Sequence, residues 1–218
     1  VAGNLAAHRA GLNAWRVYVA TLLLILPALA GARLLYVAIN WKWYRRHPRA
    51  IWNVRQGGYV MYGGLPLVLV SSIPLLRSLR IDFGAFWDVS SFTILTGMIL
   101  TRIGCLLNGC CAGRHSNAWF SARLPNSDGV WASRVPTQLF EAACAGLLLI
   151  SAAALWKQMP FPGALFLCVT LGYSIARFLM EFAREQQPGS RSFRVAHVIS
   201  VAAFFVSIAV LTIRWPNQ

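Results

Sequence analysis

The chain has 218 residues, of which 57% are hydrophobic and only 12% are charged. Its 20 Lys and Arg residues face 6 Asp and Glu residues, so the formal net charge is +14. The high apolar content excludes a disordered basic tail, and it argues against a soluble nucleic-acid-binding protein, whose basic residues lie on a mixed polar surface. A chain this apolar and this basic indicates a membrane protein in contact with anionic lipid.

Six segments are apolar enough to cross a membrane, since a helix needs about 20 apolar residues to span the hydrocarbon core. They cover residues 17–39, 58–76, 83–107, 135–156, 158–180 and 195–213. The longest connection, residues 108–134, is rich in Gly, Ser, Asn and Arg. The sequence therefore predicts an all-α polytopic transmembrane bundle that forms a single integral membrane domain over residues 1–218. We expect residues 108–134 to form a small head at one interface.

The first of these segments has a second interpretation. Arg9 and Arg16 precede an apolar stretch that contains small residues, which is also typical of a cleaved signal peptide. The apolar stretch continues beyond the small residues to Ile39, and this length favours a retained span. Pro27 within it predicts a kink whose freed carbonyl a neighbouring helix satisfies.

Five ionisable side chains are predicted to lie at membrane depth: Arg33, Arg102, Glu141, Arg177 and Glu181. Each costs roughly 2.5–3.5 kcal/mol on insertion scales, so such residues are candidates for a functional site. Arg177 and Glu181 are four residues apart and can pair on one helix face, while Glu141 can neutralise a second arginine. One positive charge then remains, which indicates an anionic ligand such as a phospholipid phosphate. The alternative is a set of structural ion pairs with arginines that extend toward the interface.

The five cysteines do not indicate a disulfide framework, because their number is odd and two of them lie in apolar runs. The adjacent Cys110 and Cys111 do not have a standard zinc spacing, so we expect no metal site and no cofactor. Near Arg114, the Cys110 thiol could instead form a thiolate nucleophile. Packing as a small apolar side chain is the alternative for Cys110 and the favoured interpretation for Cys105.

Five motifs occur in an order that resembles the prolipoprotein diacylglyceryl transferase family, over about residues 30–184. The first is GARLLYV (31–37), and the second combines HP (47–48) with QGGYVMYGGL (56–65). The other three are TRIGCLLNGCCAG (101–113), VPTQLFEA (135–142) and GYSIARFLMEFARE (172–185). The resemblance implies a multi-pass enzyme of the bacterial inner membrane. It would move a diacylglyceryl group from phosphatidylglycerol to the cysteine thiol of a prolipoprotein, whose signal peptide would be a partner, and release glycerol 1-phosphate.

The resemblance also implies roles for individual residues. Arg102 and Arg177 would bind the lipid phosphate, and Glu181 would orient them. The positions that it assigns to substrate binding are Arg33, Gly63, Gly64, Asn108, Gly113, Gln138, Glu141 and Tyr173.

The chain departs from the family pattern where protons would be handled. Tyr62 replaces the histidine of the family's HGGL element, Cys110 replaces the glutamate of its signature, and Cys105 replaces an asparagine. We therefore expect the phosphate-binding part of the site to be retained, with Tyr62 and Cys110 as candidate catalytic residues in place of the usual ones. Tyr62 could donate a hydrogen bond to the phosphate, and the alternative is a tyrosine that only lies at the membrane interface. The alternatives are a divergent paralogue with another acceptor and a non-catalytic phospholipid-binding membrane protein. A small-solute transporter is less well supported, because no inverted repeat is visible.

The charge distribution and the resemblance predict opposite orientations in the membrane. The loops after the first, third and fifth spans hold eleven Lys and Arg residues, against six in the other loops and the termini. The positive-inside rule would place those eleven in the cytoplasm. The resemblance places the head over residues 108–134 outside, and we favour that orientation.

Overall fold

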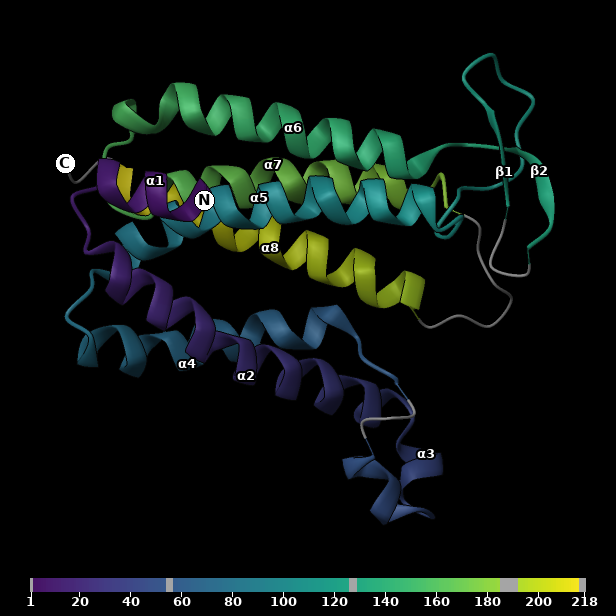
Figure 1. Ribbon diagram of the computed structural model, residues 1–218, viewed down its shortest axis with the longest axis horizontal. Coiled ribbons are helices and arrows are strands. Elements are labelled where there is room, and N and C mark those ends of the chain that lie inside the picture. Colours follow the sequence, from purple (N-terminus) through teal and green to yellow (C-terminus); the bar gives the residue numbers. More distant parts are fainter. Residues whose placement is uncertain (1, 54–56, 126–128, 185–191, 216–218) are drawn as a thin grey trace. The chain divides into compact units, whose positions relative to one another are not determined.

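The computed structural model describes residues 2–53, 57–125, 129–184 and 192–215, and most of these are helical (Figure 1). The predicted all-α class is confirmed. The chain divides into two compact units, one over residues 7–86 and the other over residues 1–6 with 87–218. The helices are α1 (Ala2–Arg9), α2 (Ala14–Ile39), α3 (Trp41–Tyr44), α4 (Met61–Ser78), α5 (Phe83–Leu107), α6 (Thr137–Leu155), α7 (Ala164–Glu181) and α8 (Ser192–Arg214).

Five helices in the described ranges are long and apolar enough to cross a membrane. They cover Ala14–Ile39, Phe83–Leu107, Thr137–Gln158, Ala164–Glu181 and His197–Arg214. The apolar part of α4, Gly63–Ser78, is shorter than this group. The chain is therefore a multi-pass membrane protein.

In the unit over residues 7–86, α2 and α4 cross at very close range. A Cβ atom added at Gly31 would overlap the carbonyl of Gly63, and one added at Gly63 would overlap the carbonyl of Gly31. A Cβ atom at Gly64 would lie 2.7 Å from the carbonyl oxygen of Ala28. Small residues permit such backbone contact between membrane helices, so this crossing depends on the glycines.

In the other unit, α5, α6, α7 and α8 form the helical body, with α7 packed against both α6 and α8. Asp88 on α5 is buried, and its carboxylate accepts hydrogen bonds from the backbone N–H groups of Gly163 (2.7 Å) and Phe166 (2.9 Å). These N–H groups lie at the start of α7, where no intrahelical acceptor is available. Asp88 thus fixes the start of α7 against α5 although the two are distant in sequence.

A small hairpin stands at one end of this unit. The strands β1 (Ala122–Pro125) and β2 (Trp131–Arg134) pair in antiparallel register. The loop between α5 and β1 is tied to neighbouring elements through its backbone, because the N–H of Gly113 donates to Val135 and that of Arg114 donates to Ala183, both at 2.9 Å. The ends of α5, α6 and α7 therefore meet at this loop.

Candidate functional site

A single buried carboxylate, Glu141 on α6, contacts three arginines. Arg102 on α5 reaches its Oε2 atom through Nη2. Arg177 on α7 and Arg184 just beyond α7 both reach Oε1, at 3.1 and 2.8 Å. Glu141 is only 4% exposed, so the four side chains interact where solvent screening is weak.

A second buried carboxylate, Glu181, completes the group. Its Oε2 atom lies 2.7 Å from Nη2 of Arg177, one helical turn away, and 3.8 Å from Nε of Arg184. The Arg177–Glu181 pair that the spacing predicts is therefore present. We call the five residues the arginine–glutamate cluster: Arg102, Glu141, Arg177, Glu181 and Arg184.

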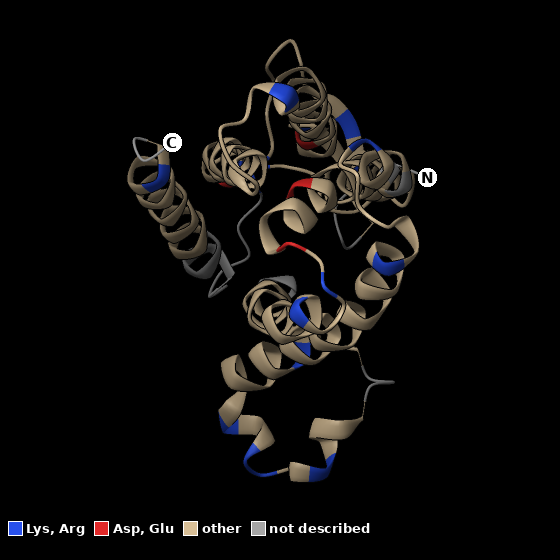
Figure 2. Cartoon of the chain, turned by 90° about the vertical axis from the view of Figure 1, so that its left-hand side faces the viewer, with Lys and Arg blue, Asp and Glu red and all other residues tan. Residues whose placement is uncertain are grey.

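The arginine–glutamate cluster carries three positive and two negative charges, so it keeps a net charge of +1. Acidic residues are scarce throughout the chain (Figure 2). Arg102 and Arg184 retain some solvent exposure, at 15% and 24% of the side chain, whereas Arg177 is buried. An anion can therefore approach the cluster at Arg102 and Arg184 without dismantling it.

The loop after α5 is held beside this cluster by the first turn of α6. Gln138, which is 2% exposed, donates from Nε2 to the carbonyl of Cys110 at 2.7 Å, and Thr137 donates from Oγ1 to the carbonyl of Cys111 at 2.9 Å. The Oε1 atom of Gln138 has no hydrogen-bond partner among the described residues. A Cβ atom at Gly113 would lie 2.6 Å from the Ala183 carbonyl oxygen, so the loop also requires this glycine.

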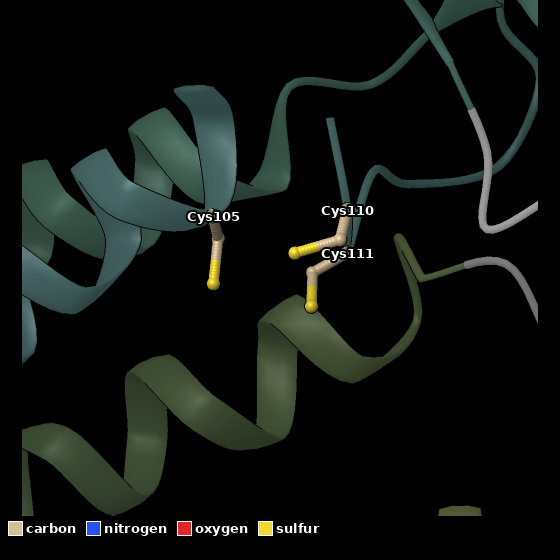
Figure 3. Close-up of side chains that lie close together, drawn as sticks. All are labelled: Cys105, Cys110 and Cys111. Carbon is tan, nitrogen blue, oxygen red and sulfur yellow. The ribbon is translucent and has the colours of Figure 1, made fainter. Parts of the chain in front are cut away.

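Three thiols meet at the start of the same loop (Figure 3). The Sγ atoms of Cys105, Cys110 and Cys111 all lie within 4.8 Å of one another. Burial raises the pKa of the Cys110 thiol, but hydrogen bonds from Cys111, Asn108 and Cys105 outweigh it and bring that pKa below its ordinary value. Desolvation and the neighbouring Cys110 raise the pKa of Cys111 to about 11. Cys110 is therefore the more readily ionised of these two loop thiols.

Two further predicted site residues lie near the cluster in sequence and space. Asn108 is exposed just after α5, and its side chain hydrogen-bonds the Cys110 thiol. Tyr173 is partly exposed on α7, one turn before Arg177.

The remaining predicted site residues belong to the unit over residues 7–86. Arg33 is buried there, and its guanidinium donates to the backbone carbonyls of Ile51, Ala50, Asn53, Gly58 and Gly57. It also lies over the rings of Tyr36, Tyr44 and Tyr59, at 5.6–5.8 Å from their centroids.

Three more predicted positions belong to the first turn of α4. Gly63 and Gly64 form the α2–α4 crossing described above. Tyr62 belongs to the same turn of α4, but its side chain lies outside the described residues.

Sequence reasoning missed Arg184 as a member of the cluster, because we assigned it to a loop. Two signals point to it: it lies three residues after Glu181, and it is the last arginine of the GYSIARFLMEFARE motif. Arg184 gives the cluster its third positive charge, whereas the guanidinium of Arg33 binds backbone carbonyls of its own unit.

Comparisons with known proteins match nearly the whole chain. A sequence model of the family described as "Prolipoprotein diacylglyceryl transferase" matches residues 2–213. A phosphatidylglycerol–prolipoprotein diacylglyceryl transferase of Bacillus anthracis (strain A0248) is 31% identical over 209 residues, which cover 90% of this chain and 76% of the relative. A Bacillus cytotoxicus protein of the same name is 31% identical over 198 residues, covering 86% and 72%.

Proposed function

The chain belongs to the prolipoprotein diacylglyceryl transferase family, and we propose that it moves a diacylglyceryl group from phosphatidylglycerol to the cysteine thiol of a prolipoprotein. The thiol sulfur bonds to the glyceryl carbon as the bond from that carbon to the phosphate oxygen breaks. The products are a thioether and glycerol 1-phosphate. The reaction would take place in the bacterial cytoplasmic membrane, with the prolipoprotein signal peptide as partner.

The net positive charge of the arginine–glutamate cluster is the observation that carries this proposal. Negative charge builds up on the departing phosphate in the transition state, and fixed guanidinium groups in a site of low dielectric stabilise it. Arg102, Arg177 and Arg184 are already oriented by Glu141 and Glu181, so little reorganisation is needed when the phosphate arrives. The two carboxylates act as positioning residues.

Gln138, three residues before Glu141 on α6, supplies a hydrogen-bond acceptor. Its Oε1 atom is buried and has no partner among the described side chains and backbone, while its Nε2 atom is fixed to the Cys110 carbonyl. A buried acceptor of this kind is costly unless a donor reaches it. The glycerol hydroxyl of the phosphatidylglycerol headgroup is such a donor, and this contact would distinguish the donor lipid from lipids without a headgroup hydroxyl.

The acceptor thiol must lose a proton, because the thiolate is the nucleophile. We assign the proton acceptor to Cys110, whose pKa lies below its ordinary value and which occupies the position of the family's glutamate. The Cys110→Ser variant tests this assignment. Loss of turnover with retained lipid binding is expected, whereas unchanged turnover would show that Cys110 only packs there.

The overall reaction is tested with labelled phosphatidylglycerol and a peptide that carries a prolipoprotein cysteine. The purified protein should release glycerol phosphate, and Arg102→Ala or Arg177→Ala should abolish the release. Arg123→Ala is the matched control, since Arg123 is an exposed arginine on β1 and should leave the release unchanged. Release that persists in both cluster variants would refute the role of the cluster.

A second candidate function is phospholipid binding without transfer, or transfer to a different acceptor. The observation that favours it is the loss of the family's histidine and glutamate, where this chain has Tyr62 and Cys110. Bound phosphatidylglycerol without any release of glycerol phosphate would support the binding protein. Release that occurs without the prolipoprotein peptide, and with another thiol, would support a different acceptor.

A further inference from the structure

The three thiols at the end of α5 form the most concentrated group of metal-ligating side chains in the described ranges. The sulfur atoms of Cys105, Cys110 and Cys111 lie within 4.8 Å of one another, and no described histidine or carboxylate joins the group. Figure 3 shows that Cys105 comes from the helix, that the other two come from the loop after it, and that the three side chains approach one another. None of them forms a disulfide.

The backbone has an unusual conformation in the loop that carries Cys110 and Cys111. Gly109 has φ of 65° and Cys111 has φ of 64°, so both adopt the left-handed conformation. Among the described non-glycine residues only Arg80 shares this feature, which strains the backbone of a residue that has a Cβ atom. Adjacent side chains in an extended chain point apart, whereas this bend allows Cys110 and Cys111 to reach the same point. Such strain persists where the surrounding structure imposes it, often at functional sites.

The loop that carries the thiols is fixed before any ligand arrives. The N–H of Cys110 donates to the carbonyl of Cys105 at 3.0 Å, which closes the turn after α5. Gln138 and Thr137 hold the carbonyls of Cys110 and Cys111 from α6. The sulfur positions are thus constrained by two helices, as a preorganised ligand set requires.

The spacing of the sulfur atoms suits a three-coordinate metal. A metal–sulfur bond of about 2.3 Å places three trigonal sulfur atoms about 4.0 Å apart, so the group needs to contract by less than about 1 Å. Zinc usually takes four ligands, and a set of three thiolates without nitrogen or oxygen donors favours soft ions, above all Cu(I). The three thiols therefore favour a soft metal ion with a low coordination number.

The positive charge near the thiols also suits a bound metal ion. Three thiolates with one Cu(I) ion carry a net charge of −2, which needs positive charge nearby. The arginine–glutamate cluster, which has a net charge of +1, supplies such charge. Arg102 lies one helical turn before Cys105 on the same face of α5.

We propose that Cys105, Cys110 and Cys111 form a site for one soft monovalent metal ion, with Cu(I) bound by three thiolates at the end of α5. The site is separate from the phosphate-binding arginines, and its occupancy does not depend on the transfer reaction proposed above. Metal bound there would engage the Cys110 sulfur, so the loaded protein would release glycerol phosphate more slowly if Cys110 acts in the reaction.

The test uses the full-length protein in detergent, reduced and kept free of oxygen, with Cu(I) delivered from a coloured Cu(I) chelator. We expect one equivalent of Cu(I) per chain, held in competition with the chelator. Each of Cys105→Ser, Cys110→Ser and Cys111→Ser should weaken binding at least tenfold. The matched controls Cys144→Ser and Cys168→Ser remove thiols outside the group and should retain the full equivalent.

A glycine variant at Cys111 protects the test against misfolding. Glycine adopts the left-handed conformation without strain, so Cys111→Gly should fold at least as well as the parent protein and still lose Cu(I). X-ray absorption of the loaded parent protein should show three sulfur neighbours of copper. The proposal is overturned if the reduced protein with five titratable thiols takes up no Cu(I), if the two control variants lose it equally, or if equimolar Zn(II) displaces it.

Discussion

Replacing Glu141 by glutamine should destabilise the protein strongly although the side-chain volume hardly changes. The carboxylate contacts Arg102, Arg177 and Arg184, and the substitution removes a negative charge that all three share. The cluster would then carry a net charge of +2, with Glu181 as its single remaining carboxylate.

The size of the effect follows from burial. Removing one partner of a buried ion pair costs about 3–5 kcal/mol. Two of the three arginines keep 15% and 24% of their side-chain exposure and can partly rehydrate, so the lower end applies, about 3 kcal/mol. For a chain of this length each kcal/mol corresponds to roughly 2–4 °C, which predicts a melting temperature about 6–12 °C lower.

Thermal unfolding in detergent, followed by circular dichroism, measures this shift. Adding Arg184→Gln to Glu141→Gln returns the cluster to a net charge of +1, and the double variant should melt above the Glu141→Gln single variant. Adding Arg123→Gln instead removes an exposed arginine and should give no recovery. If Arg184→Gln lowers the melting temperature further, or if Arg123→Gln restores it equally, charge balance in the cluster is not the cause.

Three further predictions follow from other contacts. Gly113→Ala should lower the free energy of unfolding by about 1–3 kcal/mol, because its new Cβ atom meets backbone carbonyls. Gly97→Ala on α5 has open space around the new Cβ atom, so in the same melting assay it should be neutral or stabilise the protein by up to about 1 kcal/mol. Asp88→Asn removes the charge that accepts two N–H groups at the start of α7, and it should lower stability by about 1.5–3 kcal/mol in thermal melts; an unchanged melting temperature would contradict this role. Iodoacetamide alkylation, measured by mass spectrometry across a range of pH, should modify Cys110 at a lower pH than Cys111. The midpoint for Cys110 should lie below pH 9.0, whereas Cys111, with a pKa of about 11, is only about 1% ionised at pH 9. The reverse order of modification would refute the assignment.

Local spacing was enough to predict part of the site. Arg177 and Glu181 pair because residues four apart share one helix face, and no tertiary information is needed for that inference. Glu141 was predicted to neutralise a second arginine, since a carboxylate in an apolar span needs a partner. The resemblance over five motifs identified the family, which the comparisons show.

Other features depend on chain reversals that the sequence does not reveal. The sequence predicts Arg33 as a charge at membrane depth, but its partners are backbone carbonyls. Every residue has a backbone carbonyl, so no pattern of side chains predicts which ones bind this arginine. Arg184 joins the cluster because α7 ends at Glu181 and residues 182–183 form a turn. Cys105 meets the two later cysteines only because Gly109 and Cys111 adopt the left-handed conformation.

The environment of Arg33 bears on how the protein is made. The carbonyls of described residues that bind its guanidinium all come from positions 17 to 25 residues later in the chain. Synthesis proceeds from the N-terminus, so the groups that solvate this arginine emerge from the ribosome directly after the helix that contains it. The cost of carrying the charge into the bilayer can therefore be offset during translation, before α5 and all later helices exist.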